Sequence, residues 1–156
     1  MQKTGKSILW ISIFIALLTV MGCGSLSQAV IEADMVAVQA QVQGGKSVNA
    51  IDKWGWTPLL WAVYYNYYQI SEYLLEKGAD PNIKSVQNQG AIPMGSTPLL
   101  VASYYGNAKI VELLLKHGAD QNIRNNAGNT AHDVAAKYNF IPVLELMAQD
   151  RKNNKP

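Results

Sequence analysis

Few side chains in this chain could carry out catalysis. Its 156 residues contain one cysteine, Cys23, and two histidines, His117 and His132. A cysteine nucleophile needs a base beside it and a catalytic zinc ion needs three protein ligands, so this set supplies neither centre. His132 is followed by Asp133, but adjacent helical residues do not face each other and no nucleophile accompanies them. We therefore expect no enzyme activity, no metal and no cofactor.

The N-terminal residues have the composition of an export signal. Lys3 and Lys6 precede an almost wholly apolar run from Ile8 to Met21. This run is shorter than a membrane-spanning helix, which needs about 20 apolar residues. These two lysines belong to the 13 basic side chains, so removal of the segment leaves 11 basic against 11 acidic side chains. A chain without net charge has no electrostatic footprint for nucleic acid, and we expect no such partner.

Cys23 is unpaired, because a single cysteine cannot form an intramolecular disulfide even in an oxidising compartment. Residues 20–23 (Val-Met-Gly-Cys) resemble the bacterial lipobox, in which an aliphatic, a tolerant and a small position precede a cysteine that becomes lipid-modified. The resemblance implies a lipoprotein signal peptide at 1–22, a lipidated N-terminus at 23–25 and lipidation of Cys23. An ordinary secretory signal or an uncleaved anchor is the alternative. In a Gram-negative host, the sorting pattern favours the periplasmic face of the outer membrane, because Gly24 stands where aspartate causes retention.

The rest of the chain repeats itself. Residues 56–82 align without a gap with residues 96–122, and a third copy begins at Gly128. Thr97 and Thr130 are 33 residues apart, and a fainter copy at 29–49 lies at the same offset from the first full copy. A period of about 20–50 residues is typical of solenoids and other repeat arrays.

Each full copy predicts a pair of helices. Thr57 and Thr97 can cap a helix, and the proline after each suits the first helical position, where no amide donor is needed. Apolar residues four apart, such as Ile70 and Leu74, give the second helix an apolar face, and Gly78 can end it. We expect the first helices to end at residues that accept a left-handed turn, namely Asn66, Gly106 and Asn139.

These motifs resemble the ankyrin repeat, whose pattern runs through G-x-TPLH, a short turn, an apolar second helix and GADxN. Two Thr-Pro-Leu triplets, two Gly-Ala-Asp triplets and the 33-residue period carry the resemblance. It implies an all-α ankyrin-repeat solenoid of stacked helix pairs with extended loops at 26–149. Its parts are an N-terminal cap repeat (26–51), full repeats at 52–84 and 96–124, and a C-terminal cap repeat (125–149), followed by a disordered tail (150–156).

One interval in the array is longer than the period. Thr57 and Thr97 are 40 residues apart, and the extra residues fall at 85–95 (SVQNQGAIPMG). Insertions in repeat arrays map to loops on one face, often the binding face. We expect an extended finger that carries Ile92, Pro93 and Met94, and that either contacts a partner or is a plain spacer.

Ankyrin stacks bind through their loop fingers and the inner surface of the first helices, so the resemblance implies a binding surface at the equivalent positions. These positions are rich in Trp and Tyr, the residue types enriched at binding hot spots. The implied partner-binding residues are Trp54, Trp56, Tyr64, Tyr65, Met94, Tyr104, Tyr105 and Tyr138. Packing of these rings between repeats is the alternative, and we expect it for Trp61, Tyr67, Tyr68 and Tyr73.

The sequence therefore predicts a monomeric, lipid-anchored envelope protein that binds an unknown partner protein as an adaptor or an inhibitor. Two narrower roles stay open: an immunity protein that neutralises a toxic effector in the periplasm, and an envelope-stress or assembly factor. A binder of small ligands or peptidoglycan is a further class.

Overall fold

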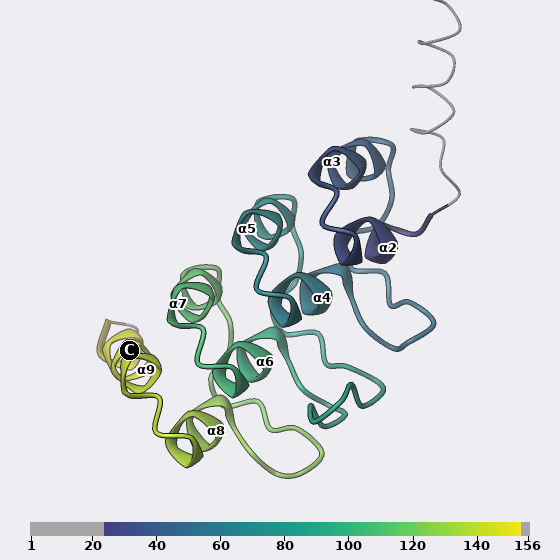
Figure 1. Cartoon of the computed structure of the whole chain (residues 1–156). Helices are drawn as coiled ribbons and strands as arrows, with labels where there is room; N and C mark the ends of the chain where they lie inside the picture. The colour runs from purple at the N-terminus through teal and green to yellow at the C-terminus, as the bar shows by residue number, and fades with distance from the viewer. Residues whose placement is uncertain (1–23, 154–156) are drawn as a thin grey trace, which may run out of the picture.

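The computed structural model describes residues 24–153, whose helices stack in consecutive pairs (Figure 1). The pairs are α2 (Leu26–Ile31) with α3 (Met35–Gln43), α4 (Pro58–Tyr64) with α5 (Tyr68–Glu76), α6 (Pro98–Tyr104) with α7 (Ala108–Lys116), and α8 (Ala131–Lys137) with α9 (Ile141–Asn153). Cys23 and the expected signal peptide lie outside the described residues. Within the described part of the chain, no helix is long and apolar enough to cross a membrane.

The helices form two rows. Figure 1 shows α2, α4, α6 and α8 side by side in a first row, α3, α5, α7 and α9 in a second, and loops that project on the side of the first row. Along the first row, α4 packs against α2 and α6, and α6 packs against α8. The predicted fold class, an all-α solenoid of stacked helix pairs, is confirmed.

The helices begin and end at the residues that the repeat motif indicates. Thr57 Oγ1 accepts a hydrogen bond from Leu60 N at 3.2 Å, and a proline occupies the first turn of both α4 and α6. The residues that follow the first helices adopt left-handed backbone angles, with φ of 59° at Asn66, 68° at Gly106 and 57° at Asn139. The chain can then reverse into the second helix of each pair.

The core lies between the two rows and continues from repeat to repeat. Leu60 and Leu100, which stand where the ankyrin pattern has histidine, are 0% and 2% exposed. Burying a leucine contributes about 1.5–3 kcal/mol, so apolar packing replaces the polar link at these positions.

Asparagines tie each loop to the next. Asn49 Nδ2 donates to Gly78 O at 3.2 Å, and Asn49 Oδ1 accepts from Asp80 N at 2.9 Å. Asn82 makes the same two bonds one repeat further on, at 3.1 and 2.8 Å. These paired bonds fix the spacing of consecutive loops.

The last helix extends further than expected, so the prediction of a disordered tail is wrong for residues 150–153. These residues continue α9, and two of them hold the buried side chain of Gln121. Gln121 Nε2 donates to Asp150 Oδ2 at 2.7 Å, and Gln121 Oε1 accepts from Arg151 Nε at 3.0 Å. The polar composition of the tail gave no sign of this partner, which lies some 30 residues earlier.

Candidate functional site

Tyr65, Tyr105 and Tyr138 occupy the same place in three consecutive repeats. They are the C-terminal capping residues of α4, α6 and α8. Their exposed fractions are nearly equal, at 40%, 42% and 41%. The stack therefore presents one tyrosine per repeat at equivalent sites.

These side chains belong to a larger set of exposed and half-buried rings that we call the aromatic row: Trp54, Tyr64, Tyr65, Tyr104, Tyr105 and Tyr138. Its members touch across the repeats. The ring centroids of Tyr64 and Tyr105 lie 5.7 Å apart, those of Tyr105 and Tyr104 5.7 Å, and those of Tyr104 and Tyr138 5.2 Å, all edge to face. Each such pair contributes about 0.5–1.5 kcal/mol beyond area burial, so the rings hold one another in place.

The N-terminal end of the aromatic row rests on Trp61. Trp54 meets the Trp61 ring edge to face at 6.0 Å, and Tyr65 stacks on it at 6.0 Å with an interplanar angle of 18°. Trp61 is buried, and its Nε1 donates to Asp52 Oδ2 at 2.7 Å. Asp52 Oδ1 accepts from Trp54 N at 2.9 Å, so one carboxylate orients both tryptophans.

Trp56 is not part of the exposed surface, contrary to the expectation from the sequence. Its ring is 0% exposed and packs against Trp61 at 4.9 Å and Tyr64 at 5.5 Å. Its Nε1 donates to Gln87 O at 3.2 Å, and this carbonyl belongs to the extended finger. A partner cannot touch Trp56, which instead supports Tyr64 from the core side.

Among the rings that we expected to pack between repeats, Trp61 is buried and Tyr67 and Tyr73 are half-buried against the core. The expectation is wrong for Tyr68, which is 39% exposed. Tyr68 is the first residue of α5, in the second row, and its Oη donates to Glu72 Oε1 at 3.3 Å.

The extended finger is fixed to the loops on both sides of it. Val86 N donates to Gly55 O at 2.9 Å, and Met94 O accepts from Asn126 N at 3.0 Å. Ile92 is 1% exposed, whereas Met94 is 39% exposed. The finger is therefore an ordered part of the loop surface, and Met94 is the member of the expected Ile-Pro-Met group that it presents most.

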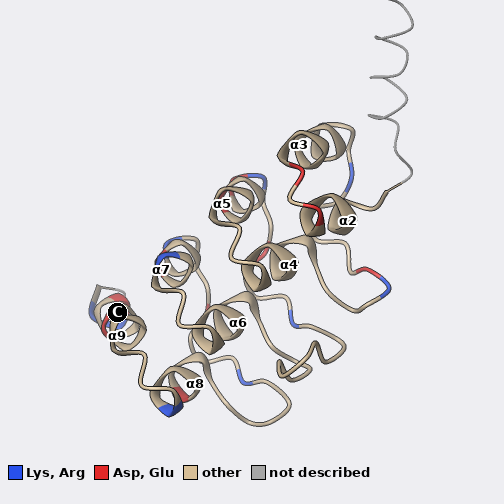
Figure 2. Ribbon diagram, viewed as in Figure 1, with Lys and Arg blue, Asp and Glu red and all other residues tan. Residues whose placement is uncertain are grey.

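The aromatic row is uncharged along its middle and basic at its two ends. Helices α4 and α6 contain no charged residue, and Figure 2 shows charged residues on α7, α8 and α9 and on the segments between helices. Lys53 Nζ lies 4.3 Å from the ring centroid of Trp54, and Lys137 Nζ lies 5.4 Å from that of Tyr138. A ligand would meet a neutral aromatic strip with a cation at each end.

The hydroxyl groups at the centre of the row stay protonated at neutral pH. Burial raises the pKa of Tyr105 to about 12, and a hydrogen bond with Tyr64 acts in the same direction. Tyr138 Oη and Tyr104 Oη form a hydrogen bond of 3.1 Å, and this bond is the main cause of the raised pKa of Tyr104. Protonated phenols can donate hydrogen bonds to a ligand.

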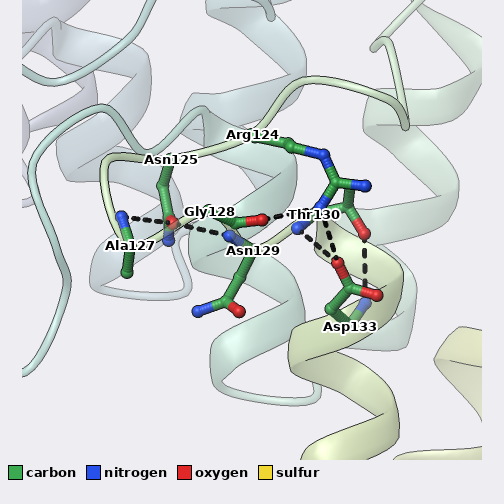
Figure 3. A network of polar contacts seen from close by, with 7 residues as sticks. All are labelled: Arg124, Asn125, Ala127, Gly128, Asn129, Thr130 and Asp133. Atoms are coloured by element: carbon green, nitrogen blue, oxygen red, sulfur yellow. Dashed lines mark hydrogen bonds and ion pairs between the residues drawn. The ribbon is translucent and has the colours of Figure 1, made fainter.

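Asp133, which follows His132 in the sequence, is built into the last loop and helix (Figure 3). Asp133 Oδ2 accepts from Thr130 N at 2.9 Å and pairs with Arg124 Nη1 at 3.3 Å, while Asp133 N donates to Thr130 Oγ1 at 3.2 Å. The backbone hydrogen bond from Thr130 is the main cause of the lowered pKa of Asp133. This carboxylate caps α8. Among residues 24–153, no three His, Cys, Asp or Glu side chains lie close enough to hold a metal ion.

Comparison with known families agrees with this architecture. Residues 54–86 match the family model described as "Ankyrin repeat", and residues 84–156 match the one described as "Ankyrin repeats (3 copies)". Because the two matches together cover more than half of the chain, the protein belongs to the ankyrin-repeat family. Stacks of this kind present extended surfaces that bind other proteins.

Curated relatives share the repeats over part of their length. The 2-5A-dependent ribonuclease of Mus musculus is 43% identical over 70 residues, which are 44% of this chain and 9% of that protein. Human protein phosphatase 1 regulatory subunit 27 is 28% identical over 93 residues, 60% of this chain and 59% of the relative. An ankyrin repeat protein of Borreliella burgdorferi is 36% identical over 55 residues, 35% of this chain and 25% of the relative. The chain thus covers less than two thirds of each relative.

Proposed function

We propose that this chain is a lipid-anchored protein of the bacterial envelope that captures a partner protein on its aromatic row, as an adaptor or an inhibitor without catalysis of its own. The observation that carries the proposal is the row: equivalent tyrosines that are equally exposed in three repeats and are linked by ring contacts through Tyr64 and Tyr104. Aromatic side chains bury a large area on binding and keep a polar tip that can form hydrogen bonds.

The row is ordered before a partner arrives. Fixing a free side chain on binding costs about 0.5–1.5 kcal/mol, and rings already held by their neighbours avoid much of this cost. A binding and regulating role also agrees with the name of one relative, a regulatory subunit of protein phosphatase 1. The ribonuclease match does not argue for catalysis, because it is confined to 9% of that protein.

The anchor in this proposal is Cys23. Only Gly24 and Ser25 separate this cysteine from α2, and Ser25 Oγ already caps the helix by accepting from Gln28 N at 3.2 Å. A lipid on Cys23 therefore holds the first repeat directly at the membrane surface, and the periplasmic face of the outer membrane is the favoured location. Two acyl chains give stable anchoring.

A photo-crosslinking residue tests the binding surface in the intact envelope. Placed at Tyr105, it should form an adduct with a protein; placed at Tyr68, it should form none. Tyr68 is the matched control, because it is also a tyrosine and is 39% exposed, but lies on α5 in the second row. Adducts of equal yield at both positions, or at position 68 alone, would contradict the proposal.

Identification of the adduct by mass spectrometry separates the narrower roles. A toxic effector indicates an immunity protein, whereas a resident envelope protein indicates a stress or assembly factor. The anchor is tested by Cys23→Ala, which should abolish labelling with fatty acid and release the protein from the membrane fraction. A variant that still labels or stays membrane-bound would show that the lipoprotein assignment is wrong.

A further inference from the structure

The spacing of the three equivalent tyrosines, Tyr65, Tyr105 and Tyr138, fits some conformations of a bound peptide better than others. The helices that carry them pack side by side along the first row, and packed helices lie about 8–10 Å apart. A polyproline II segment rises about 3.1 Å per residue with three residues per turn, so one turn spans about 9 Å. Tyr65, Tyr105 and Tyr138 therefore match every third residue of such a segment, within about seven residues in all.

Other peptide conformations fit the row less well. In an extended strand, residues on one face recur about every 6.6 Å, and every second one of them recurs at about 13 Å. Neither distance matches the spacing of about 8–10 Å between packed helices. An α-helix brings residues seven apart to about 10.5 Å, but its carbonyls are occupied by internal hydrogen bonds. A polyproline II segment has no internal hydrogen bonds and leaves its carbonyls free.

The row offers donors for those carbonyls. Tyr138 Oη and Tyr104 Oη lie 3.1 Å apart in one hydrogen bond, which uses one of their two O–H groups and leaves the other free to donate. The hydrogen bond between Tyr105 and Tyr64, which contributes to the raised pKa of Tyr105, likewise uses one of their two O–H groups. Grooves lined by aromatic rings are the general means by which domains recognise proline-rich peptides.

Charge defines the flanks of the ligand. Helices α4 and α6 carry no charge, and Lys53 and Lys137 mark the two ends of the row. The nearby carboxylates are occupied: Asp52 accepts from Trp54, Trp56 and Trp61, and Asp133 is held by Thr130 and Arg124. Neither lysine forms an ion pair with a described residue.

We propose that the aromatic row takes an uncharged proline-rich segment in the polyproline II conformation, with an apolar residue at every third position and an acidic residue on each flank. This inference deepens the proposed function and rests on it, because it names the chemistry of the segment that the row captures.

The test uses the full mature chain and synthetic peptides in isothermal titration calorimetry. The probe is a 13-residue peptide with prolines at positions i, i+3 and i+6 between aspartates. A peptide of the same composition with its prolines adjacent should bind at least about tenfold more weakly, since it can meet one tyrosine only. A lysine-flanked version should also bind more weakly, and that difference should shrink as salt screens the charges.

Variants then locate the site. Tyr105→Ala should weaken binding at least about tenfold, Tyr105→Phe should weaken it less because the ring remains, and Tyr68→Ala should leave it unchanged. Circular dichroism melting checks that each variant is folded. If Tyr105→Ala does not fold, Tyr138→Ala serves as the second test of the row.

Four outcomes would overturn the inference: equal binding of the peptide with adjacent prolines, an equal loss in Tyr68→Ala, preference for a peptidoglycan tetrasaccharide over the peptide, or no binding of the peptide. The last outcome together with a protein adduct at position 105 overturns the inference and leaves the proposed function standing. Absence of the adduct at position 105 overturns the proposed function itself.

Discussion

Trp54 and Trp56 lie two residues apart in one loop and have opposite surroundings. Trp54 is 37% exposed beneath Lys53, whereas Trp56 is 0% exposed and bonded to the carbonyl of Gln87. At this scale one tryptophan is exposed in the aromatic row and the other supports the row from the core, so the two should differ in how much they stabilise the fold.

We predict that Trp56→Ala lowers the free energy of unfolding by about 3–5 kcal/mol, because it leaves a cavity where a large ring was buried. Trp54→Ala should cost no more than about 1 kcal/mol, because its ring is partly solvated and loses mainly one edge-to-face contact. Urea unfolding followed by circular dichroism measures both values. Equal losses in the two variants would show that the two surroundings are not as different as described.

The sequence could not separate these two tryptophans. Alignment with the other repeats assigns both to the finger, and both have the residue type of a hot spot. Trp56 packs on Trp61 and Tyr64, and its Nε1 donates to the carbonyl of Gln87 in the insertion, which has no counterpart in the 33-residue period. Helix starts were predictable in contrast, because Thr57 caps α4 through a bond to a residue three positions away.

The raised pKa of Tyr105 makes the free energy of unfolding depend on pH in the alkaline range. Its pKa is about 12 in the folded protein, raised from 10.0, so its contribution to stability is present below pH 10. Between about pH 10 and 12 the unfolded chain releases this proton first, and stability falls as the pH rises. We predict a steeper loss over this range for the wild type than for Tyr105→Phe. Urea unfolding at pH 9, 10 and 11 measures it, and parallel curves would contradict the assignment.

At the scale of elements, the extended finger keeps its place through close backbone approach. Gly95 has φ of 80°, and a Cβ built there would lie 2.3 Å from Asn126 Oδ1 and 3.0 Å from Asn126 N. Gly128 has φ of 81° in the next loop, but a Cβ there meets nothing within 4 Å. The two glycines share their backbone conformation and differ in their neighbours.

We predict that Gly128→Ala costs about 1 kcal/mol of stability, the strain of a left-handed residue with a side chain. Gly95→Ala should cost about 1–3 kcal/mol more, because the finger and the following loop must also move apart. The difference between the two free energies of unfolding isolates the contact between loops. Equal values would indicate that the loops are not tightly stacked.

The length and place of the finger could be read from the 40-residue interval between Thr57 and Thr97. Its ordering could not, because the bonds from Val86 N to Gly55 O and from Asn126 N to Met94 O join backbone groups, which any residue supplies.

At the scale of the whole molecule, the stack is a chain of contacts between neighbours, so its stability is close to a sum of repeat and interface contributions. At the C-terminal end, the buried side-chain amide of Gln121 forms hydrogen bonds with the side chains of Asp150 and Arg151. Its Nε2 also donates to Met147 O at 3.2 Å. A change at this end should therefore act locally.

We predict that deletion of residues 150–156 lowers the free energy of unfolding by about 1–3 kcal/mol, because Gln121 stays buried and loses two of its three described partners. Hydrogen exchange measured by mass spectrometry should accelerate in α8 and α9 and change little in α4 and α5, since each repeat contacts only its neighbours. Deletion of residues 154–156 alone is the matched control and should leave Gln121 and the exchange pattern unchanged. Uniform acceleration along the chain would instead show that the stack opens as one cooperative unit.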